Sequence, residues 1–581
     1  MSANSSTRNN GVDISTLSPL ETLGDSVSKA FDPYGVTTSL LNAQMAWMLH
    51  PQELGRAAHA LSGDLFALQS HLMRRALGMP SGDVIRPNAD DARFAHPAWT
   101  NSATWDIIKE WYLAFTRRLE DMFFETPGLS DKERRRSAFW LRKWLNMVAP
   151  TNYFWLNPVA MQRFVETNGE SVRKGWQNML RDAKARNILM VEPDAFTVGK
   201  DLATTPGKVV FRNRLVELIH YAPTTERVRA TPIVIITPWI NKFYILDLTA
   251  KKSMVKYLTD QGFSVFITSW KNPGAEMADV RFDDYLLEGV NEVVRVAAEF
   301  CNVPQVHLVG YCIGGTLLSI GAAALARDGD QRPASMTMFA AQADFSEPGE
   351  LAFFINPSQL AMLEATMHRK GVLESKQMGG AFALLRAKDL VWQPIVDTYL
   401  KGQRAPMIDL MAWNADGTRM PWRMHSEYLY RLYLDNELAT NRFPVGGRLV
   451  RLSDIRLPML VVGTEADHVA PWKSVYKIDN LVRSDDFTFL LTAGGHNAGI
   501  VCGPVHPKRH YRIRTRRLAD PHLAPEEWME AATRHDGSWW PALHGWLAKH
   551  SSGRTKPPAM GAPRKGYAVI EDAPGTYVKQ R

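Results

Sequence analysis

One short stretch, from Val306 to Thr316, constrains the fold of this chain more than any other. It opens as an apolar run of strand length, turns sharply at glycine, and continues into a helix of small residues that ends near Arg327. Its centre, Gly310-x-Cys312-x-Gly314, is the nucleophile-elbow pattern with Cys in place of Ser. Side chains two positions before and after the nucleophile would collide in so tight a turn, so both positions are glycine. The pattern predicts a strand–turn–helix unit with an exposed thiol at its corner.

The helix expected after Cys312 bears on the reactivity of that thiol. The N–H groups of the first helical turn and the positive end of the helix dipole would face the sulfur and favour the thiolate. A free cysteine is also commonly buried and inert, so a structural cysteine on a glycine-rich turn is the alternative interpretation. The surroundings of the motif decide between the two.

Apolar runs on both sides of the elbow predict a parallel sheet. Continuous β-branched runs such as Thr231–Thr237 are typical of strands that are buried on both faces. Helical segments separate successive runs, and this alternation implies a mostly parallel sheet with helices on both faces. The other expected strands are Lys208–Tyr221 (a strand or hairpin), Gly262–Trp270, Val306–Gly310, Ser335–Ala341, Pro458–Gly463 and Phe487–Thr492, and the expected helices between them are Leu246–Gln261, Tyr285–Phe300 and Ile313–Arg327.

The 581 residues are too many for one small core, so we expect a large catalytic domain with an accessory domain. Residues 1–36 are rich in Ser, Asn and Thr and are expected to be loose, whereas 37–195 are expected to form a helical N-terminal domain. Residues 196–550 form the expected α/β catalytic domain. An insertion of mixed helices at about 346–457 is expected to form a lid over the site, and 551–581 an extended C-terminal tail.

Apolar residues recur at helical spacing in the N-terminal region. One stripe runs from Leu54 to Leu72 and another from Ile108 to Met122. Ser130-x-x-Glu133 reads as a capping box that opens a further helix. We expect most of these stripes to be core, and the alternative is a surface for a partner subunit or an apolar particle.

Composition excludes several classes of protein. Three cysteines are too few for a disulfide framework, which favours a reducing cytoplasm. Residues 1–16 lack the apolar segment of a secretory signal, and the longest small and apolar run, Gly314–Ala326, is too short to span a membrane. The net charge of +8 is compatible with a polyanionic ligand, but basic surfaces are ordinary, so no nucleic-acid partner is expected. The sequence shows no metal-ligand cluster, P-loop or dinucleotide fingerprint, so neither a metal nor a cofactor is expected.

A thiol nucleophile needs a base, and the base needs an orienting group. In folds with this elbow the chain order is nucleophile, acid and histidine, each on a loop after a strand. The expected strand 458–463 leads to Asp467, and the expected strand 487–492 leads to His496. We therefore predict Cys312 as nucleophile, His496 as base and Asp467 as orienting acid.

Other residues compete for two of these roles. His468 is a rival base, although it lies beside the acid and before the last strand. Glu465 and Asp344 are rival acids, and Asp344 follows a strand after which some enzymes of this fold place theirs. His307 falls inside a strand and is expected to be a core histidine.

An oxyanion hole needs two N–H donors that point at the reacting carbonyl oxygen. One donor is expected from Ile313, directly after the nucleophile. The other is expected from the loop after Thr231–Thr237, where Trp239 or Ile240 is favoured, with Asn241 beside them, because Pro238 has no N–H. Plain packing at the strand end is the alternative for this loop.

Eight motifs together resemble one known family, from about Asn157 to the C-terminus and more weakly upstream. They are Thr205–Asn213, Pro238–Leu248, Gly310–Thr316, Trp413–Thr418, Asp467-His468, Gly495–Gly499, Gly537–Trp540 and Ala573–Val578. The family is that of the polyhydroxyalkanoate synthases, particularly the class I enzymes, which have an α/β-hydrolase fold. Asn497 stands where an apolar residue is common and Cys502 where Asn-Pro is frequent, and these departures concern substrate preference more than chemistry.

The resemblance implies a function that agrees with the residue chemistry. The catalytic Cys, Asp and His of the family fall on Cys312, Asp467 and His496. The implied reaction polymerises (R)-3-hydroxyacyl-CoA, most simply 3-hydroxybutyryl-CoA, into polyester through an acyl-cysteine, with release of CoA. The family also implies a cytoplasmic homodimer at the surface of a polyester granule. A thioesterase or polyester depolymerase with the same triad, and a non-catalytic granule protein, are the alternative functions.

Overall fold

The computed structural model describes residues 32, 35–77, 79, 81, 82, 84–87, 91–185, 195–404, 406–504, 506 and 508–581. These residues belong to two compact units, Met1–Ala92 with Thr100–Val148, and Arg93–Trp99 with Ala149–Arg581. No helix among the described residues is long and apolar enough to cross a membrane.

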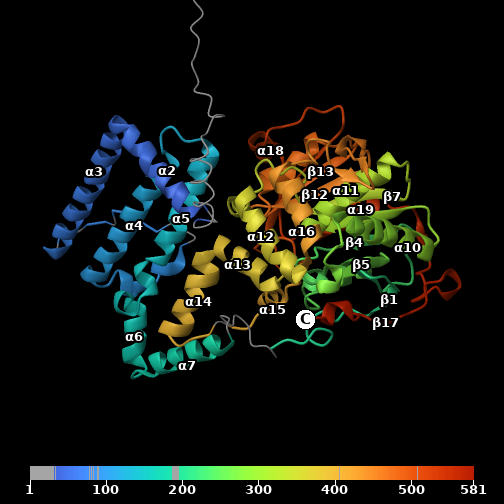
Figure 1. The fold of residues 1–581 in the computed structure, drawn as a ribbon. Helices are drawn as coiled ribbons and strands as arrows, with labels where there is room; N and C mark the ends of the chain where they lie inside the picture. Colours follow the sequence, from blue (N-terminus) through green and yellow to red (C-terminus); the bar gives the residue numbers. More distant parts are fainter. Residues whose placement is uncertain are drawn as a thin grey trace, which may run out of the picture. The chain divides into compact units, whose positions relative to one another are not determined.

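The first unit is helical (Figure 1), as expected for the N-terminal region. Helix α5 begins at the predicted capping box, where Ser130 N donates to Glu133 Oε2 at 2.9 Å and Glu133 N donates to Ser130 Oγ at 3.4 Å. Tyr112 joins α4 to α5 through its hydroxyl, which donates to Leu145 O at 3.0 Å. The helices of this unit are α2 (Val36–Leu49), α3 (Pro51–Ala76), α4 (Ala103–Phe124) and α5 (Asp131–Met147).

The predicted apolar face of α4 is not its buried face. Trp111, in the middle of the stripe, is 50% exposed, whereas Asp106, Lys109 and Glu110 are buried. Their charges compensate one another: Lys109 and Arg75 both form ion pairs with Asp106. The stripe on α3 is likewise only partly buried, because Leu54 and Leu65 are exposed. The expectation that these stripes are mostly core is therefore wrong for both helices.

The second unit is built on an eleven-stranded sheet with the order β15-β14-β13-β12-β7-β6-β4-β5-β2-β1-β17. Its six central strands, from β13 to β5, are parallel, and the strands outside them are antiparallel. This arrangement confirms the predicted mostly parallel sheet. The strands are β1 (Gly207–Arg212), β2 (Val216–Tyr221), β4 (Ile233–Ile236), β5 (Val265–Trp270), β6 (Val306–Tyr311), β7 (Pro333–Phe339), β12 (Met459–Thr464), β13 (Phe487–Thr492), β14 (His510–Arg516), β15 (Thr533–Asp536) and β17 (Glu571–Asp572).

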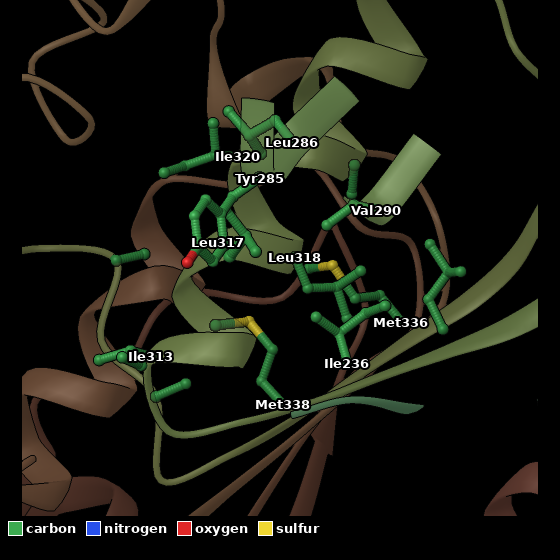
Figure 2. Close-up of a cluster of buried hydrophobic side chains, with 14 of the residues drawn as sticks. Ile236, Tyr285, Leu286, Val290, Ile313, Leu317, Leu318, Ile320, Met336 and Met338 are labelled. Atoms are coloured by element: carbon green, nitrogen blue, oxygen red, sulfur yellow. The ribbon is translucent and has the colours of Figure 1, made fainter. Parts of the chain in front are cut away.

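Helices cover the sheet and meet it through two large hydrophobic clusters. Figure 2 shows part of one cluster, where side chains of α11 (Ile313–Arg327) and η7 (Tyr285–Asn291) lie against Ile236 of β4 and Met336 and Met338 of β7. Cys312 packs against both clusters, so the elbow is held from two sides. The remaining helices of the unit outside the insertion are α6 (Pro158–Glu166), α7 (Glu170–Ala185), α8 (Met254–Asp260), α9 (Phe282–Asp284), α10 (Glu292–Cys301), α17 (Trp472–Tyr476), α18 (Pro525–Ala531) and α19 (Trp540–Lys549).

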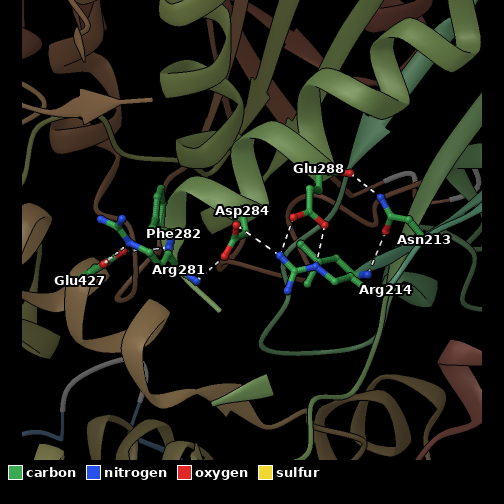
Figure 3. A network of polar contacts seen from close by, with 8 residues as sticks. Asn213, Arg214, Arg281, Phe282, Asp284, Glu288 and Glu427 are labelled. Carbon is green, nitrogen blue, oxygen red and sulfur yellow. Dashed lines mark hydrogen bonds and ion pairs between the residues drawn. The ribbon is translucent and has the colours of Figure 1, made fainter. Parts of the chain in front are cut away.

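The segment between β7 and β12 is the predicted helical insertion. Its α16 (Trp422–Tyr428) is tied to the rest of the unit by Glu427, which accepts hydrogen bonds from Arg281 Nε at 3.1 Å and Phe282 N at 2.9 Å (Figure 3). The main elements of the insertion are η8 (Glu350–Phe354), α12 (Pro357–Lys370), α13 (Ser375–Leu385), η9 (Lys388–Trp392), α14 (Gln393–Ile395), η10 (Val396–Leu400), α15 (Asp409–Ala415), α16 (Trp422–Tyr428) and η11 (Leu429–Leu434), with the short strands β8 (Val372–Leu373), β9 (Met420–Pro421), β10 (Pro444–Val445) and β11 (Arg448–Leu449).

Helix α7 packs against this insertion. Asp182 accepts a hydrogen bond from Tyr399 Oη at 2.9 Å and pairs with Arg404 at 2.9 Å. Both α6 and α7 belong to the second unit, although they lie within the 37–195 range expected for the N-terminal domain. The domain limits at 36, 195 and 550 stay predictions.

Candidate active site

The elbow has the geometry that its sequence predicts. Cys312 lies between β6 and α11 with φ 54° and ψ −131°, a backbone conformation that non-glycine residues rarely adopt. A Cβ on Gly310 would approach Gly315 Cα at 2.5 Å, and a Cβ on Gly314 would approach Ile236 O at 2.5 Å. The flanking glycines are therefore required by close backbone contact, and the strained backbone presents a partly exposed thiol.

Asp467 and His496 meet beside this thiol. His496 Nδ1 lies 2.8 Å from Asp467 Oδ2, and the Cys312 side chain is close enough to raise the pKa of the imidazole. The other carboxylate oxygen of Asp467 accepts from the backbone N–H groups of Val469 at 2.9 Å and Ala470 at 2.8 Å. The carboxylate is thus fixed on one side by its own loop and orients the imidazole on the other. The three side chains predicted from chain order lie together.

Electrostatics favour charge separation in this group. Burial alone would raise the pKa of Asp467, but the charge of His496 and the hydrogen bonds to the carboxylate hold that pKa below its usual value. Burial alone would lower the pKa of His496, but Asp467 and the negative charge of Cys312 raise it well above its usual value. The imidazolium form of His496 is therefore stabilised by its neighbours.

The rival acids are engaged elsewhere. Asp344 accepts hydrogen bonds from Ser346 N at 2.8 Å and Asn436 Nδ2 at 2.9 Å. Glu465 Oε1 lies 3.0 Å from His510 Nε2. Among the described residues neither carboxylate contacts His496, whose acidic partner is Asp467. The strand histidine His307 is buried between Ser335 and Ser551, 2.7 Å and 2.9 Å away, which agrees with the core role expected for it.

The loop after β4 lies next to the elbow, because Gly314 packs on its first residues. The backbone N–H groups of Ile313, Trp239 and Ile240 have no hydrogen-bond partner among the described residues. Thr418 of the insertion holds the carbonyl side of the same loop, since its N–H donates to Ile240 O at 2.9 Å and its hydroxyl donates to Trp239 O. Asn241 forms an isolated antiparallel β-bridge with Gly417 of the insertion. Free N–H groups at these positions fit the expected oxyanion donors.

Two tyrosines of the insertion lie near Cys312. The rings of Tyr428 and Tyr433 are 5.6 Å apart, and burial together with the nearby charge of Cys312 raises the pKa of both phenols. Tyr428 also lies 6.1 Å, ring to ring, from Trp239. Trp413, another aromatic of the insertion, is instead a core residue whose Nε1 donates to Lys242 O at 2.7 Å. The site is therefore bordered by a small part of the insertion.

One buried cluster in the first unit has metal-ligating side chains that the sequence analysis missed. Ligand atoms of His71, Asp106 and Glu110 lie within 4.8 Å of one another. Arg75 and Lys109 already pair with Asp106 and balance the two carboxylates. A divalent cation would add uncompensated charge to this buried position. We therefore assign the cluster no ion.

Sequence reasoning also missed two neighbours of His496. The Tyr311 ring stacks on His496 with centroids 5.7 Å apart, and its hydroxyl donates to Asn497 Oδ1 at 2.5 Å. Both residues directly adjoin a predicted triad member in the chain. That adjacency, together with the departure of Asn497 from the family pattern, is the signal in the sequence that points to them.

Comparison with known proteins gives consistent matches. A family model described as the N-terminus of poly-beta-hydroxybutyrate polymerase (PhaC) matches residues 90–258, and one described as alpha/beta hydrolase fold matches residues 232–501. The chain is 36% identical to the poly(3-hydroxyalkanoate) polymerase of Methylorubrum extorquens, over 94% of this chain and 90% of that protein. It is 35% identical to the poly(3-hydroxyalkanoate) polymerase subunit PhaC of Cupriavidus necator, over 93% and 91%. Among solved structures, the complex of DcsB with a substrate analogue is 15% identical, covers 60% of this chain and 99% of its own, and has a TM-score of 0.34.

Proposed function

The chain belongs to the poly(3-hydroxyalkanoate) polymerase family, and from this premise we propose that it polymerises (R)-3-hydroxyacyl-CoA through an acyl-enzyme on Cys312. The observation that carries the proposal is Cys312 at a strained elbow beside His496, which is hydrogen-bonded to Asp467. The simplest substrate is 3-hydroxybutyryl-CoA. The reaction needs no cofactor, because the CoA thioester itself supplies the activated acyl group.

Acylation is the first half of the cycle. His496 takes the Cys312 proton, and the thiolate attacks the carbonyl carbon of the substrate thioester. The N–H groups of Ile313 and of Trp239 or Ile240 stabilise the oxyanion that forms. The bond from carbon to the CoA sulfur then breaks, His496 returns the proton to CoA, and a thioester on Cys312 remains. One thioester replaces another, which keeps this step close to thermoneutral.

Ester formation is the second half. His496 removes the proton from the hydroxyl of another hydroxyacyl unit, and its oxygen attacks the acyl-cysteine carbonyl. The bond from carbon to Cys312 sulfur breaks, and the new bond is the ester of the polymer. Water is the competing acceptor, so the pocket must hold the hydroxyl and exclude water. Tyr428 and Tyr433, which lie near Cys312, are assigned to this exclusion.

Exposed apolar side chains fit a protein that works on a polyester surface. Besides Trp111 in the first unit, Trp155 and Trp176 in the second unit are exposed, Trp155 at 76%. We assign the chain to a homodimer at the granule surface in the cytoplasm. This assignment rests on the family and on these exposed side chains.

Product analysis tests the proposed function. The purified chain is incubated with 3-hydroxybutyryl-CoA while released CoA, insoluble polyester and free 3-hydroxybutyrate are all measured. CoA release accompanied by polyester is the expected result. CoA release matched by soluble 3-hydroxybutyrate, with no polyester, would identify a thioesterase and overturn the proposal.

A further inference from the structure

Tyr311 and Asn497 join the nucleophile strand to the loop of the base. Tyr311 is the last residue of β6, directly before Cys312, and Asn497 directly follows His496. The Tyr311 hydroxyl donates to Asn497 Oδ1 at 2.5 Å and lies 3.5 Å from His496 O. Asn497 is itself held by its turn, because its carbonyl accepts from Ile500 N at 3.1 Å and Val501 N at 2.9 Å.

The stacked ring supplies a constraint that the triad lacks. The hydrogen bond that His496 Nδ1 donates to Asp467 fixes one nitrogen of the ring, but a ring held at that one point can still pivot about the bond. The face of the Tyr311 phenol, 5.7 Å from the imidazole centroid and inclined by 29°, restricts this pivot. Burial and the nearby charges of Cys312 and Asp467 raise the pKa of Tyr311 well above its usual value. The phenol therefore remains a hydrogen-bond donor at working pH.

We propose that the Tyr311–Asn497 pair positions His496 for catalysis, a role that rests on the proposed function of Cys312. Asn497 holds the phenol by its hydroxyl, and the phenol holds the plane of the imidazole. The nitrogen remote from Asp467 then stays directed at Cys312 through both proton transfers. The charged and titratable groups around His496 are Asp467, Cys312 and Tyr311, and Tyr428 and Tyr433 lie near Cys312.

Two variants separate the parts of this contact. Tyr311→Phe keeps the stacked ring and removes the hydroxyl, whereas Asn497→Leu removes the acceptor at similar size. Each should lower kcat by about tenfold with KM within about twofold, and the double variant should be no worse than either one, because both remove the same hydrogen bond. Asn497→Asp keeps an acceptor and should recover most of the activity.

A second readout detects a change of the triad itself. Iodoacetamide alkylation of Cys312, followed by peptide mass spectrometry across pH, reports how well His496 stabilises the thiolate. The midpoint of the profile should rise by about half a pH unit or more in both variants. Tyr476→Phe is the matched control, because Tyr476 is a buried tyrosine outside the site whose hydroxyl donates to Leu523 O at 3.1 Å. It should change neither kcat nor the profile.

The inference is overturned if both folded variants keep the parental kcat. It is equally overturned if kcat falls while the alkylation profile stays that of the parent, because the loss would then be structural. Failure of the proposed function is distinguishable: a chain that yields free 3-hydroxybutyrate would still show the profile shift.

Discussion

At the scale of single residues, one hydrogen bond to His496 distinguishes Asp467 from the two rival acids. Three carboxylates follow central strands near the site, but Asp467 is the one that contacts His496, while Asp344 and Glu465 have partners of their own. Chain order also favours Asp467. In this fold an acid on the loop after β12 lies next to a histidine on the loop after β13. The Tyr311–Asn497 contact could not be predicted, because the sequence does not show that the end of β6 meets the loop after β13.

Replacing each carboxylate by its amide tests this choice. Asp467→Asn should lower kcat by about a thousandfold or more, because an amide cannot hold the His496 tautomer or stabilise the imidazolium. Asp344→Asn should change kcat by no more than about threefold, since the site does not use it. CoA release, measured for both folded variants, gives the comparison, and equal or reversed losses would show that the acid is misassigned.

At the scale of elements, burial decides how much of the fold the sequence could predict. The central strands were recognisable because β4, β6, β12 and β13 are buried on both faces and read as continuous apolar runs. Strand β14 was missed because its arginines remain partly exposed and interrupt any apolar pattern. The buried face of α4 was misjudged because paired charges, which look like surface in a sequence, lie inside.

The insertion should depend on its polar anchor. Glu427, one residue before Tyr428, holds α16 through Arg281 and Phe282 (Figure 3). Glu427→Ala should loosen this helix, admit water to the acyl-cysteine and raise the ratio of free 3-hydroxybutyrate to polyester by about threefold or more. Glu288→Ala, at the other end of the network, is the control and should leave the ratio unchanged. The same ratio of free 3-hydroxybutyrate to polyester in both variants would contradict the proposal that α16 excludes water.

Strand β2 carries a histidine that should make stability depend on pH. His220 is fully buried between Phe266 and Phe300, and burial lowers its pKa to about 4. The unfolded chain takes up this proton near pH 6.5, whereas the folded chain does so only near pH 4. The free energy of unfolding therefore falls by up to about 3 kcal/mol because of His220 as pH falls from 6.5 to 4. This cost is absent above the unfolded pKa and grows on acidification.

Thermal melts of His220→Phe test that dependence. The variant should lose less of its Tm than the parent between about pH 7.5 and about pH 5, because phenylalanine takes up no proton. His535→Phe, at an exposed position on β15, is the control. A second variant, His220→Leu, guards against overpacking by the larger ring. A parental pH slope in both His220 variants would contradict the account.

At the scale of the whole molecule, residues far apart in the sequence complete the site. The C-terminal residues lie against the segments that follow β4 and β5: Lys242 Nζ, after β4, donates to Gln580 O at 2.8 Å, and Asn272 N, after β5, donates to Gln580 Oε1 at 3.1 Å. Lys242 is buried, so this acceptor is needed to satisfy its ammonium group. The sequence indicated an extended tail but not where it would dock.

Deleting Gln580 and Arg581 tests the tail. Lys242 would lose its acceptor, the nearby N–H donors of the loop after β4 would lose their fixed position, and kcat should fall by about tenfold. Gln580→Ala keeps the backbone carbonyl and should keep most of the activity. CoA release by the deleted chain at the parental rate would show that the tail does not support the site.

The central claim is that Cys312 carries the growing acyl chain. The most direct measurement is peptide mass spectrometry after rapid acid quench of the enzyme with 3-hydroxybutyryl-CoA. The peptide that contains Cys312 should gain a 3-hydroxybutyryl group, the peptides with Cys301 and Cys502 should remain unmodified, and a folded Cys312→Ala variant should release no CoA. CoA release without acylation of Cys312, or turnover by the folded Cys312→Ala variant, would contradict the account.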